Sequence, residues 1–269
     1  MHLNKRNRLK KILMRVLITL IIVLLGATIL FKSCAVKKYN STSQPVTHEL
    51  WTTLVQKHVS EKGQVNYKGF IQDSLLLNRY LDVLRSAHPN DRFWSQDERL
   101  AYWINAYNAF TVKLIVDNYP VKSIKDIKSG IPFINDVWEI NFIEIEGKSY
   151  NLNYIEHRIV RKRWKEPRIH AAFNCASFSC PRLRNEAFTA DRLNEQLDDQ
   201  MSYFINNPDK NQLDPDNPKM SKLFSNLWYG KDFKQTGLSK IEFINQYAKI
   251  KINKNADVDY LDYKWNLNE

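Results

Sequence analysis

The sequence predicts a helix-rich α+β fold, a single domain with a small β-sheet preceded by an N-terminal transmembrane helix. Three observations support this fold class. Residues 100–112 contain no charged side chain, which is typical of a helix buried on nearly all sides. Residues 138–152 alternate between apolar and polar side chains and turn at Glu146-Gly147, as a β-hairpin does. An uncharged apolar run follows a basic N-terminal flank.

We interpret residues 1–35 as a cytoplasmic basic flank followed by a membrane anchor or signal segment. The uncharged run from Val16 to Phe31 has 16 residues and reaches 20 when it is extended back to Ile12 across Arg15. A spanning helix needs about 20 apolar residues, whereas a signal-peptide core has about 7–15. We therefore expect a retained single-pass anchor. Because basic flanks stay in the cytoplasm, the rest of the chain is predicted to be periplasmic.

Two alternatives remain for this segment. The chain could be cleaved after Ala35, or it could carry a lipid on Cys34, although a lysine before Ser33 makes a poor lipidation signal. Residues 36–46 are polar and are predicted to form a linker. We expect the extracytoplasmic domain to comprise residues 47–269.

Composition excludes several classes of function. The net charge of +11 suggests a nucleic-acid partner, but seven of the 40 basic residues precede residue 35 and no acidic residue accompanies them. The remaining 33 basic and 29 acidic residues make an ordinary solvated surface, so no nucleic-acid partner is predicted. The chain has only seven glycines and no glycine-rich phosphate-binding motif, so no cofactor is predicted.

The predicted elements follow in chain order. Helices are expected at residues 48–59 and 74–86, separated by a connection, and a strand is expected at residues 168–173. Capping boxes mark two further helix starts, at Ser95 and Ser239. The helix that starts at Ser95 is expected to end before Pro120, and the hairpin follows it. Two further helices are expected, one capped by Asn151 or Asn153 that carries residues 154–164 and one from Thr189 to about Asn206. The chain is expected to end in an extended tail over residues 258–268.

Asn105 and Asn108 stand three residues apart in the uncharged helix and project from the same side. A buried amide needs hydrogen-bond partners, because leaving one unpaired costs about 1–3 kcal/mol. One interpretation is that both amides tie the backbone of neighbouring segments. The other is that one of them orients a catalytic imidazole or donates to an oxyanion.

Several segments, among them "YWINAYNAFTVKLIVDNYP", "IEHRIV", "PRIHAAFNCASFSCPRLRNEAF" and the terminal "YLDYKWNLN", resemble the domain-of-unknown-function family 547 (DUF547). The resemblance runs from about residue 47 to 267 and indicates a bacterial, membrane-anchored member. It implies no established activity. It does imply that a set of polar positions belongs to the family signature: Asn105, Asn108, His157, Arg168, His170, Cys175 and Cys180. Ala171 stands where members often have phenylalanine.

Four interpretations compete for "HAAFNCASFSCP", residues 170–181. The two cysteines could form a disulfide, which an exported location permits. They could join His157 and His170 in a zinc site, although the C-x4-C spacing is loose for zinc. They could be buried small hydrophobic residues. Finally, one cysteine could be a nucleophile at an exposed turn.

Our functional hypothesis takes the last interpretation. It predicts Cys175 as the catalytic nucleophile, with His170 or His157 as its base and Asn105 orienting the imidazole. Such a protein would be a cysteine-dependent hydrolase or acyl transferase that acts on peptide or envelope material. The alternative is a non-enzymatic protein-binding or scaffold domain at the cell envelope.

The predicted substrate-binding residues are Arg168, Asn108 and Cys180, since a guanidinium binds carboxylates through two parallel hydrogen bonds. No metal is predicted. We expect the pocket to be built by three segments, the "WINAYN" helix, the "IEH" helix and the "IHAAFNC" strand. The expected partners are the membrane and a peptide or envelope protein.

Overall fold

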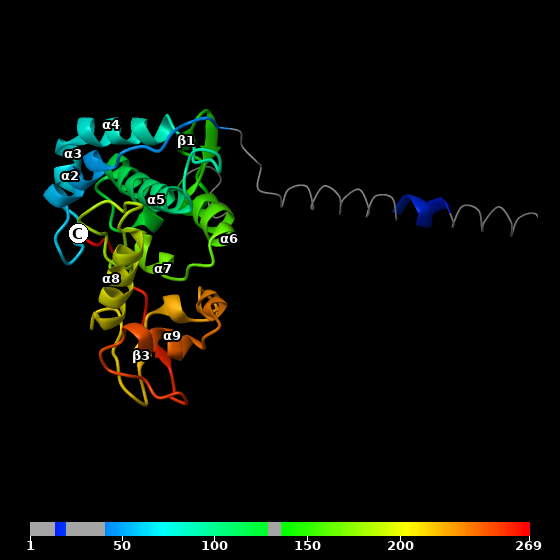
Figure 1. Ribbon diagram of the computed structural model, residues 1–269, viewed down its shortest axis with the longest axis vertical. Coiled ribbons are helices and arrows are strands. Elements are labelled where there is room, and N and C mark those ends of the chain that lie inside the picture. The colour runs from blue at the N-terminus through cyan, green and yellow to red at the C-terminus, as the bar shows by residue number, and fades with distance from the viewer. Residues whose placement is uncertain (1–13, 20–40, 129–135) are drawn as a thin grey trace, which may run out of the picture. The chain divides into compact units, whose positions relative to one another are not determined.

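A computed structural model of the chain describes residues 14–19, 41–128 and 136–269 (Figure 1). The chain divides into two compact units, residues 1–39 and 40–269. In the first unit, the described residues 14–19 are helical. The predicted anchor lies mostly outside the described residues. Within them, no helix combines the length and the apolar character needed to cross a membrane.

The second unit is rich in helices. Its α-helices are α2 (Glu49–His58), α3 (Tyr67–Gln72), α4 (Ser74–Arg85), α5 (Gln96–Asn118), α6 (Arg161–Arg163), α7 (Ile169–Ala172), α8 (Leu193–Asn206) and α9 (Lys240–Tyr247). Shorter 3-10 turns are η1 (Ile124–Asp126), η2 (Val137–Glu139), η4 (Lys222–Phe224) and η5 (Asp232–Thr236), while η3 (Tyr154–Val160) is a π-helix.

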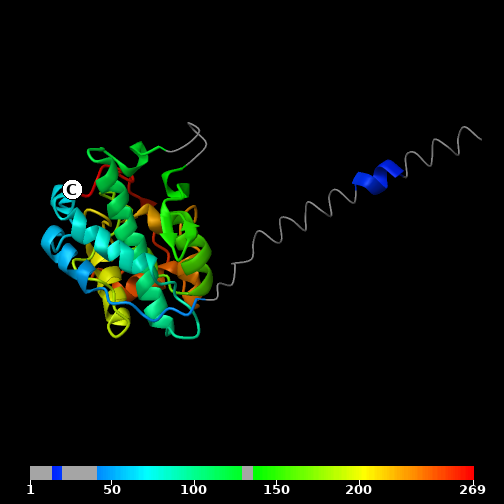
Figure 2. The ribbon, with the colours of Figure 1, turned by 90° about the horizontal axis from the view of Figure 1, so that it is seen from above.

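Helix α5 is the central element. It begins at a capping box, because the Ser95 hydroxyl accepts from the backbone N–H of Glu98 and the Glu98 carboxylate accepts from that of Ser95. Its residues are buried without a break from Leu100 to Val112, as the absence of charge predicts. Figures 1 and 2 show α5 between the helices α2 to α4 on one side and the β1–β2 hairpin on the other.

Two small two-stranded sheets complete the fold. Strands β1 (Ile143–Ile145) and β2 (Lys148–Tyr150) form the predicted antiparallel hairpin, with Glu144 opposite Ser149. Strands β3 (Lys219–Met220) and β4 (Asp259–Tyr260) pair in parallel. The described residues therefore confirm a helix-rich α+β fold.

Two hydrophobic clusters form the interior of this unit. The larger one surrounds α5 and includes Trp51 and Trp103. The smaller one gathers residues of α8, α9 and the segments between them, with Phe224 and Phe233 at its centre. Figure 1 shows α9 and β3 at the end of α8 that lies away from α4 and α5. The candidate site lies where these clusters meet.

Three local predictions were wrong. The segment 168–173 is not a strand, because residues 169–172 form the single turn α7. Short apolar runs do not distinguish a buried strand from a buried helical turn by periodicity. The connection after α2 contains α3, whose first turn is capped by the Asn66 side chain accepting from Gly69. Finally, α8 begins at Leu193 rather than at Thr189.

Candidate functional site

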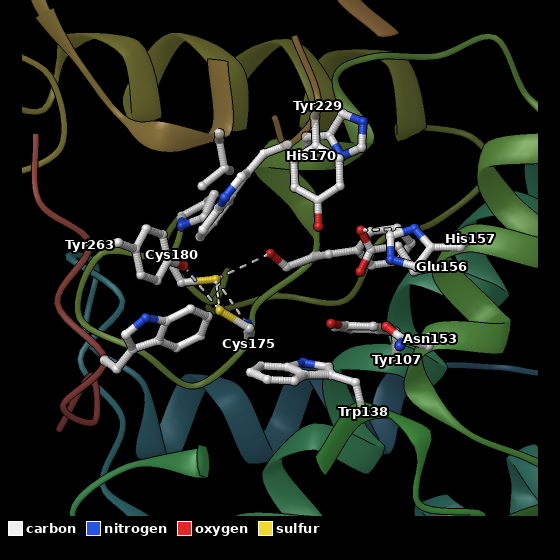
Figure 3. Close-up of a pocket in the computed structure, with 15 residues that line it drawn as sticks. Tyr107, Trp138, Asn153, Glu156, His157, His170, Cys175, Cys180, Tyr229 and Tyr263 are labelled. Carbon is white, nitrogen blue, oxygen red and sulfur yellow. Dashed lines mark hydrogen bonds and ion pairs between the residues drawn. The ribbon is translucent and has the colours of Figure 1, made fainter. Parts of the chain in front are cut away.

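A cavity of about 210 Å³ lies between the two clusters (Figure 3). Fifteen residues line it, and seven of them are aromatic, so the walls are largely apolar rings. Figure 3 shows the two cysteines and Tyr263 on one side of the cavity and Glu156 with His157 on the other. We refer to these as the cysteine end and the histidine end. All three segments predicted to build a pocket contribute, through Tyr107, His157 and Cys175 among others.

The cysteine turn is held in shape by buried amides. The Asn174 side chain accepts from the backbone N–H of Ala176 and donates to the carbonyl of Pro181. Asn108 on α5 accepts from the backbone N–H of Asn174. Ala176 has a φ of 59°, a left-handed conformation that is uncommon outside glycine. These contacts bend the backbone sharply directly after Cys175.

The C-terminal tail packs along the outside of the same turn. The backbone N–H of Phe178 donates to the carbonyl of Asn266 (2.7 Å), and Ser177 pairs with Leu267 as an isolated β-bridge. The Ser179 hydroxyl accepts from the backbone N–H of Lys264. This pairing delivers the hydroxyl of Tyr263 to the cysteines, from a position 88 residues further along the chain than Cys175.

Cys175 is half-buried and its sulfur has several hydrogen-bonding neighbours. It lies 2.8 Å from the sulfur of Cys180, 3.2 Å from the Ser177 hydroxyl and 3.2 Å from the Tyr263 hydroxyl. Burial by itself raises the pKa of this thiol. Hydrogen bonds from Cys180, Ser177 and Tyr263 outweigh burial and lower the pKa of Cys175 to about 7. A substantial share of Cys175 is therefore thiolate at neutral pH.

Cys180 has the opposite character. Its thiol is buried and free, and its sulfur accepts from the backbone N–H of Cys175 (2.9 Å). Burial raises its pKa well above the usual range, and the neighbouring Cys175 raises it further. Cys180 therefore keeps its proton and donates it to the Cys175 thiolate. The pair is a dithiol, so this structure does not contain the disulfide considered above.

At the histidine end, a carboxylate joins two basic side chains. Nε2 of His170 donates to Oδ2 of Asp232 (2.8 Å), and Arg161 makes two parallel hydrogen bonds to the same carboxylate. Burial lowers the pKa of His170, although Asp232 opposes this. Burial alone raises the pKa of Asp232, but the hydrogen bonds from His170 and Arg161 bring it well below its usual range. Tyr229 stacks on the His170 ring, with the centroids 4.0 Å apart.

His157 and Glu156 complete this end of the cavity. Nδ1 of His157 accepts from Arg161 (2.9 Å), which makes the His157 ring the neutral Nε2–H tautomer. The Glu156 carboxylate is buried, lies 3.8 Å from Nδ1 of His157 and accepts from the Tyr229 hydroxyl. Burial raises the pKa of Tyr229, and Glu156 raises it further.

The predicted cysteine–histidine pairing is not formed. Among the described residues, the hydrogen bonds of His170 and His157 go to Asp232 and Arg161, and neither imidazole bonds to a sulfur of Cys175 or Cys180. The reason is that α7 and the turn point His170 and Cys175 to different parts of the same cavity. Within the described part of the chain, no group of three or more His, Cys, Asp and Glu side chains is arranged to hold a metal ion.

Asn105 is not an imidazole-orienting residue in this structure. Its amide donates to the carbonyl of Phe188 and accepts from the backbone N–H of the same residue, so both ends are used. Asn108 likewise donates to the carbonyl of Ala172 while it accepts from Asn174. Both amides thus tie backbone segments together, the first of the two interpretations given above, and neither lines the cavity.

Arg168 also lies outside the cavity lining. Its guanidinium pairs with Glu166 (2.6 Å) and Asp198 (2.8 Å), which makes it a structural ion-pair partner rather than a visible substrate ligand. The hydrogen bonds that Arg168 donates to the Glu166 carboxylate raise the pKa of Arg168, and the one that it donates to Asp198 adds to this.

Four residues that shape the site were not predicted from the sequence: Tyr263, Ser177, Glu156 and Asp232. Glu156 and Ser177 lie within the quoted motifs, and Tyr263 lies in the tail that carries the resemblance, so a signal existed for these three. Asp232 lies in a polar stretch with no distinguishing pattern. Its partner His170 is 62 residues away, which no local spacing reveals.

Residues 92–205 match the family model described as "Protein of unknown function, DUF547". This match supports the DUF547 resemblance over the segment that contains α5, the π-helix and the cysteine turn. Tyr263, Tyr229 and Asp232 lie beyond the matched residues. No curated protein and no solved structure matches the chain.

Proposed function

We propose that this protein is a cysteine-dependent enzyme that carries out thiol–disulfide exchange. Cys175 is the attacking thiolate and Cys180 is the resolving thiol. One observation carries the proposal: the half-buried sulfur of Cys175 lines a cavity, has a pKa of about 7 and lies 2.8 Å from a second sulfur. A thiol with a pKa near ambient pH is close to optimal for attack on a disulfide.

The exchange proceeds in two balanced steps. The Cys175 thiolate attacks one sulfur of a substrate disulfide, whose S–S bond breaks, and one substrate thiol leaves after taking up a proton. Cys180 then loses its proton, attacks the Cys175 sulfur and releases the second substrate thiol. The substrate is reduced by two electrons and the protein is oxidised to the Cys175–Cys180 disulfide. A dithiol partner must reduce that disulfide before the next turnover.

Acyl transfer to Cys175, on peptide or envelope material, is the second candidate. Glu156 and His157 favour it, because both line the same cavity and an acid there could protonate a leaving group. The turn is poorly suited to hold an oxyanion. The backbone N–H groups of Cys175 and Ala176 donate to Cys180 and Asn174, so neither is free for a substrate oxygen.

Trapping experiments separate these reactions. Full-length protein with Cys34→Ser, which removes the third cysteine, is treated with 2-hydroxyethyl disulfide. We expect this protein to end with an intramolecular disulfide between Cys175 and Cys180. In the double variant that also carries Cys180→Ala, one mercaptoethanol adduct should remain on Cys175. The mass of the intact protein distinguishes the two products. Cys175→Ala in the same background is the matched control and should form neither product.

Other outcomes identify the alternatives. A stable acyl adduct on Cys175 from a thioester, with no reaction at the disulfide, would support the hydrolase or acyl transferase. Two sulfurs that react no faster than those of the unfolded chain would contradict both enzymes and favour a binding or scaffold domain.

We propose further that the domain acts outside the cytoplasm, held by a single-pass anchor. The apolar run ending at Phe31 and its basic flank support this location, and a peptide or envelope protein is the expected partner there. After cell fractionation the intact chain should sediment with membranes. A soluble product that begins near Val36 would contradict the anchor.

A further inference from the structure

Thiol chemistry at the cysteine end leaves the histidine end unexplained. Glu156 is only 5% exposed, yet it lines the cavity, where its carboxylate accepts from the Tyr229 hydroxyl and lies beside the neutral His157 ring. A buried carboxylate is expensive unless it is paired with a cation or several donors. Glu156 therefore has capacity for a further partner on the cavity side.

The charges around Glu156 do not balance. Arg161 uses two nitrogens on Asp232 and a third on His157, and it influences Glu156 through space. Since His157 accepts from Arg161, that ring is neutral. Two carboxylates thus share one guanidinium. Among the described residues, no lysine or arginine lines the cavity to supply the missing positive charge.

The walls of the cavity suit a positive charge. Trp138, Trp228 and Trp265 line it together with Tyr107 and Tyr229. The faces of such rings carry partial negative charge and attract ammonium groups. The Trp265 ring already attracts one ammonium group, because Nζ of Lys125 lies 3.8 Å from its centroid. An aromatic cage with a carboxylate at its end is the chemistry that recognises organic ammonium ions.

We propose that the cavity binds a small organic ammonium group at Glu156 and that the substrate of Cys175 is a cationic disulfide. The substrate class rests on the proposed function, whereas the ammonium site does not. A cavity of about 210 Å³ exceeds the roughly 150 Å³ that holds one benzene ring, so it accommodates a compact ammonium head with a short chain. The ammonium lies at the histidine end and the substrate sulfur reaches the cysteine end.

Three methanethiosulfonate reagents that differ only in charge test the substrate class. The Cys175 thiolate attacks their sulfenyl sulfur, forms a mixed disulfide and expels methanesulfinate. The reagents carry a trimethylammonioethyl (cationic), a propyl (neutral) or a sulfonatoethyl (anionic) group. The rate of each reagent with full-length Cys34→Ser protein is divided by its rate with free 2-mercaptoethanol, which corrects for the intrinsic reactivity of the reagent. We expect the cation to react at least about 10-fold faster than the neutral reagent, which corresponds to 1.4 kcal/mol, and the anion to react slowest.

Glu156→Gln should reduce this preference to within about 2-fold. Glu144→Gln is the matched control, because Glu144 is on the exposed face of β1 and should leave the preference unchanged. Equal normalised rates for all three reagents in the parent protein, or a preference for the anion, would overturn the substrate class even if Cys175 reacts rapidly.

A binding measurement tests the ammonium site without any thiol chemistry. Choline and its neutral isostere 3,3-dimethylbutan-1-ol are titrated into full-length Cys175→Ala protein, with tryptophan fluorescence as the signal. We expect choline to bind at least about 10-fold more tightly. Tight choline binding to this variant, together with an unreactive Cys175 in the Cys34→Ser protein, would contradict the thiol chemistry and retain the ammonium site. Equal binding of both compounds, or binding of neither, would overturn the site.

Discussion

The two ends of the cavity hold charge in different ways. At the cysteine end, neutral groups form hydrogen bonds with one sulfur: a thiol, a serine hydroxyl and a tyrosine hydroxyl. At the histidine end, Asp232 is matched by Arg161 and a buried imidazole. Neutral donors stabilise a thiolate and leave it free to react. In an ion pair, by contrast, each charged group is already bound to the other. In this structure the two histidines bond to charged side chains, and neither bonds to a cysteine sulfur.

The largest expected effect comes from breaking the ion pair. Asp232→Asn removes the countercharge of Arg161 and should destabilise the protein by about 2–4 kcal/mol, somewhat below a fully buried pair because Asp232 is 15% exposed. Chemical denaturation measures this. If the two ends are independent, the rate of Cys175 alkylation in the folded variant stays within about 2-fold of the parent. A rate reduced 10-fold or more would show that the ends are coupled.

The pH dependence of stability should also separate the ends. The pKa of Cys175 is lowered to about 7, so the unfolded chain binds more protons between pH 7 and about 8.5, and stability rises with pH in that window, by about 1 kcal/mol. The pKa of His170 is lowered as well, so its contribution is present above about pH 6.5 and is lost as the pH falls below that. The pKa values of half-buried His48 and buried His88 are also lowered by burial, so both residues add to the loss at low pH.

Urea unfolding of reduced protein at pH 7, 7.75 and 8.5 measures the upper window. Cys175→Ala should abolish most of the rise there and leave the low-pH loss intact. If the stability of Cys175→Ala still increases between pH 7 and 8.5 as in the parent, the increase is caused by another titratable group.

A third test compares two amides on α5. Asn105→Leu and Asn108→Leu each orphan buried backbone groups and should each cost about 1–3 kcal/mol. Only Asn108 bonds to the cysteine turn, so only its replacement should slow alkylation of Cys175. Thermal unfolding gives the stability change and mass spectrometry gives the rate. Parent-like stability for Asn105→Leu would contradict its structural role.

The smallest expected effect is the loss of one hydroxyl. Tyr263→Phe removes one donor from the Cys175 sulfur, which contributes about 1 kcal/mol, and should lower the alkylation rate at pH 6.5 by roughly 3- to 10-fold. The rates of variant and parent should converge above pH 9, where both thiols are ionised. A uniform decrease at every pH would indicate a displaced turn. Tyr260→Phe in the same tail is a suitable control, because its hydroxyl bonds to Lys240 instead.

Features whose hydrogen-bond or pairing partners lie close along the chain could be predicted from the sequence. The capping boxes at Ser95 and Ser239 and the hairpin turn at Gly147 are satisfied within a few residues, so their patterns are readable directly. The uncharged run in α5 likewise predicts burial, because a helix without charged side chains lacks a polar face that favours contact with water. His157, His170, Cys175 and Cys180 could likewise be predicted to share one site, because they lie close together in the sequence.

The hydrogen-bond partners of those cysteines and histidines depend on the packing of distant segments and could not be predicted from the sequence. The donor Tyr263 stands 88 residues from Cys175, and Asp232 stands 62 residues from His170. A buried polar group must bond to whichever segment packs against it, and the packing of distant segments leaves no periodic trace. The short run at residues 169–172 shows the same limit, since the larger core rather than local pattern made it a helical turn and directed His170 away from the cysteines.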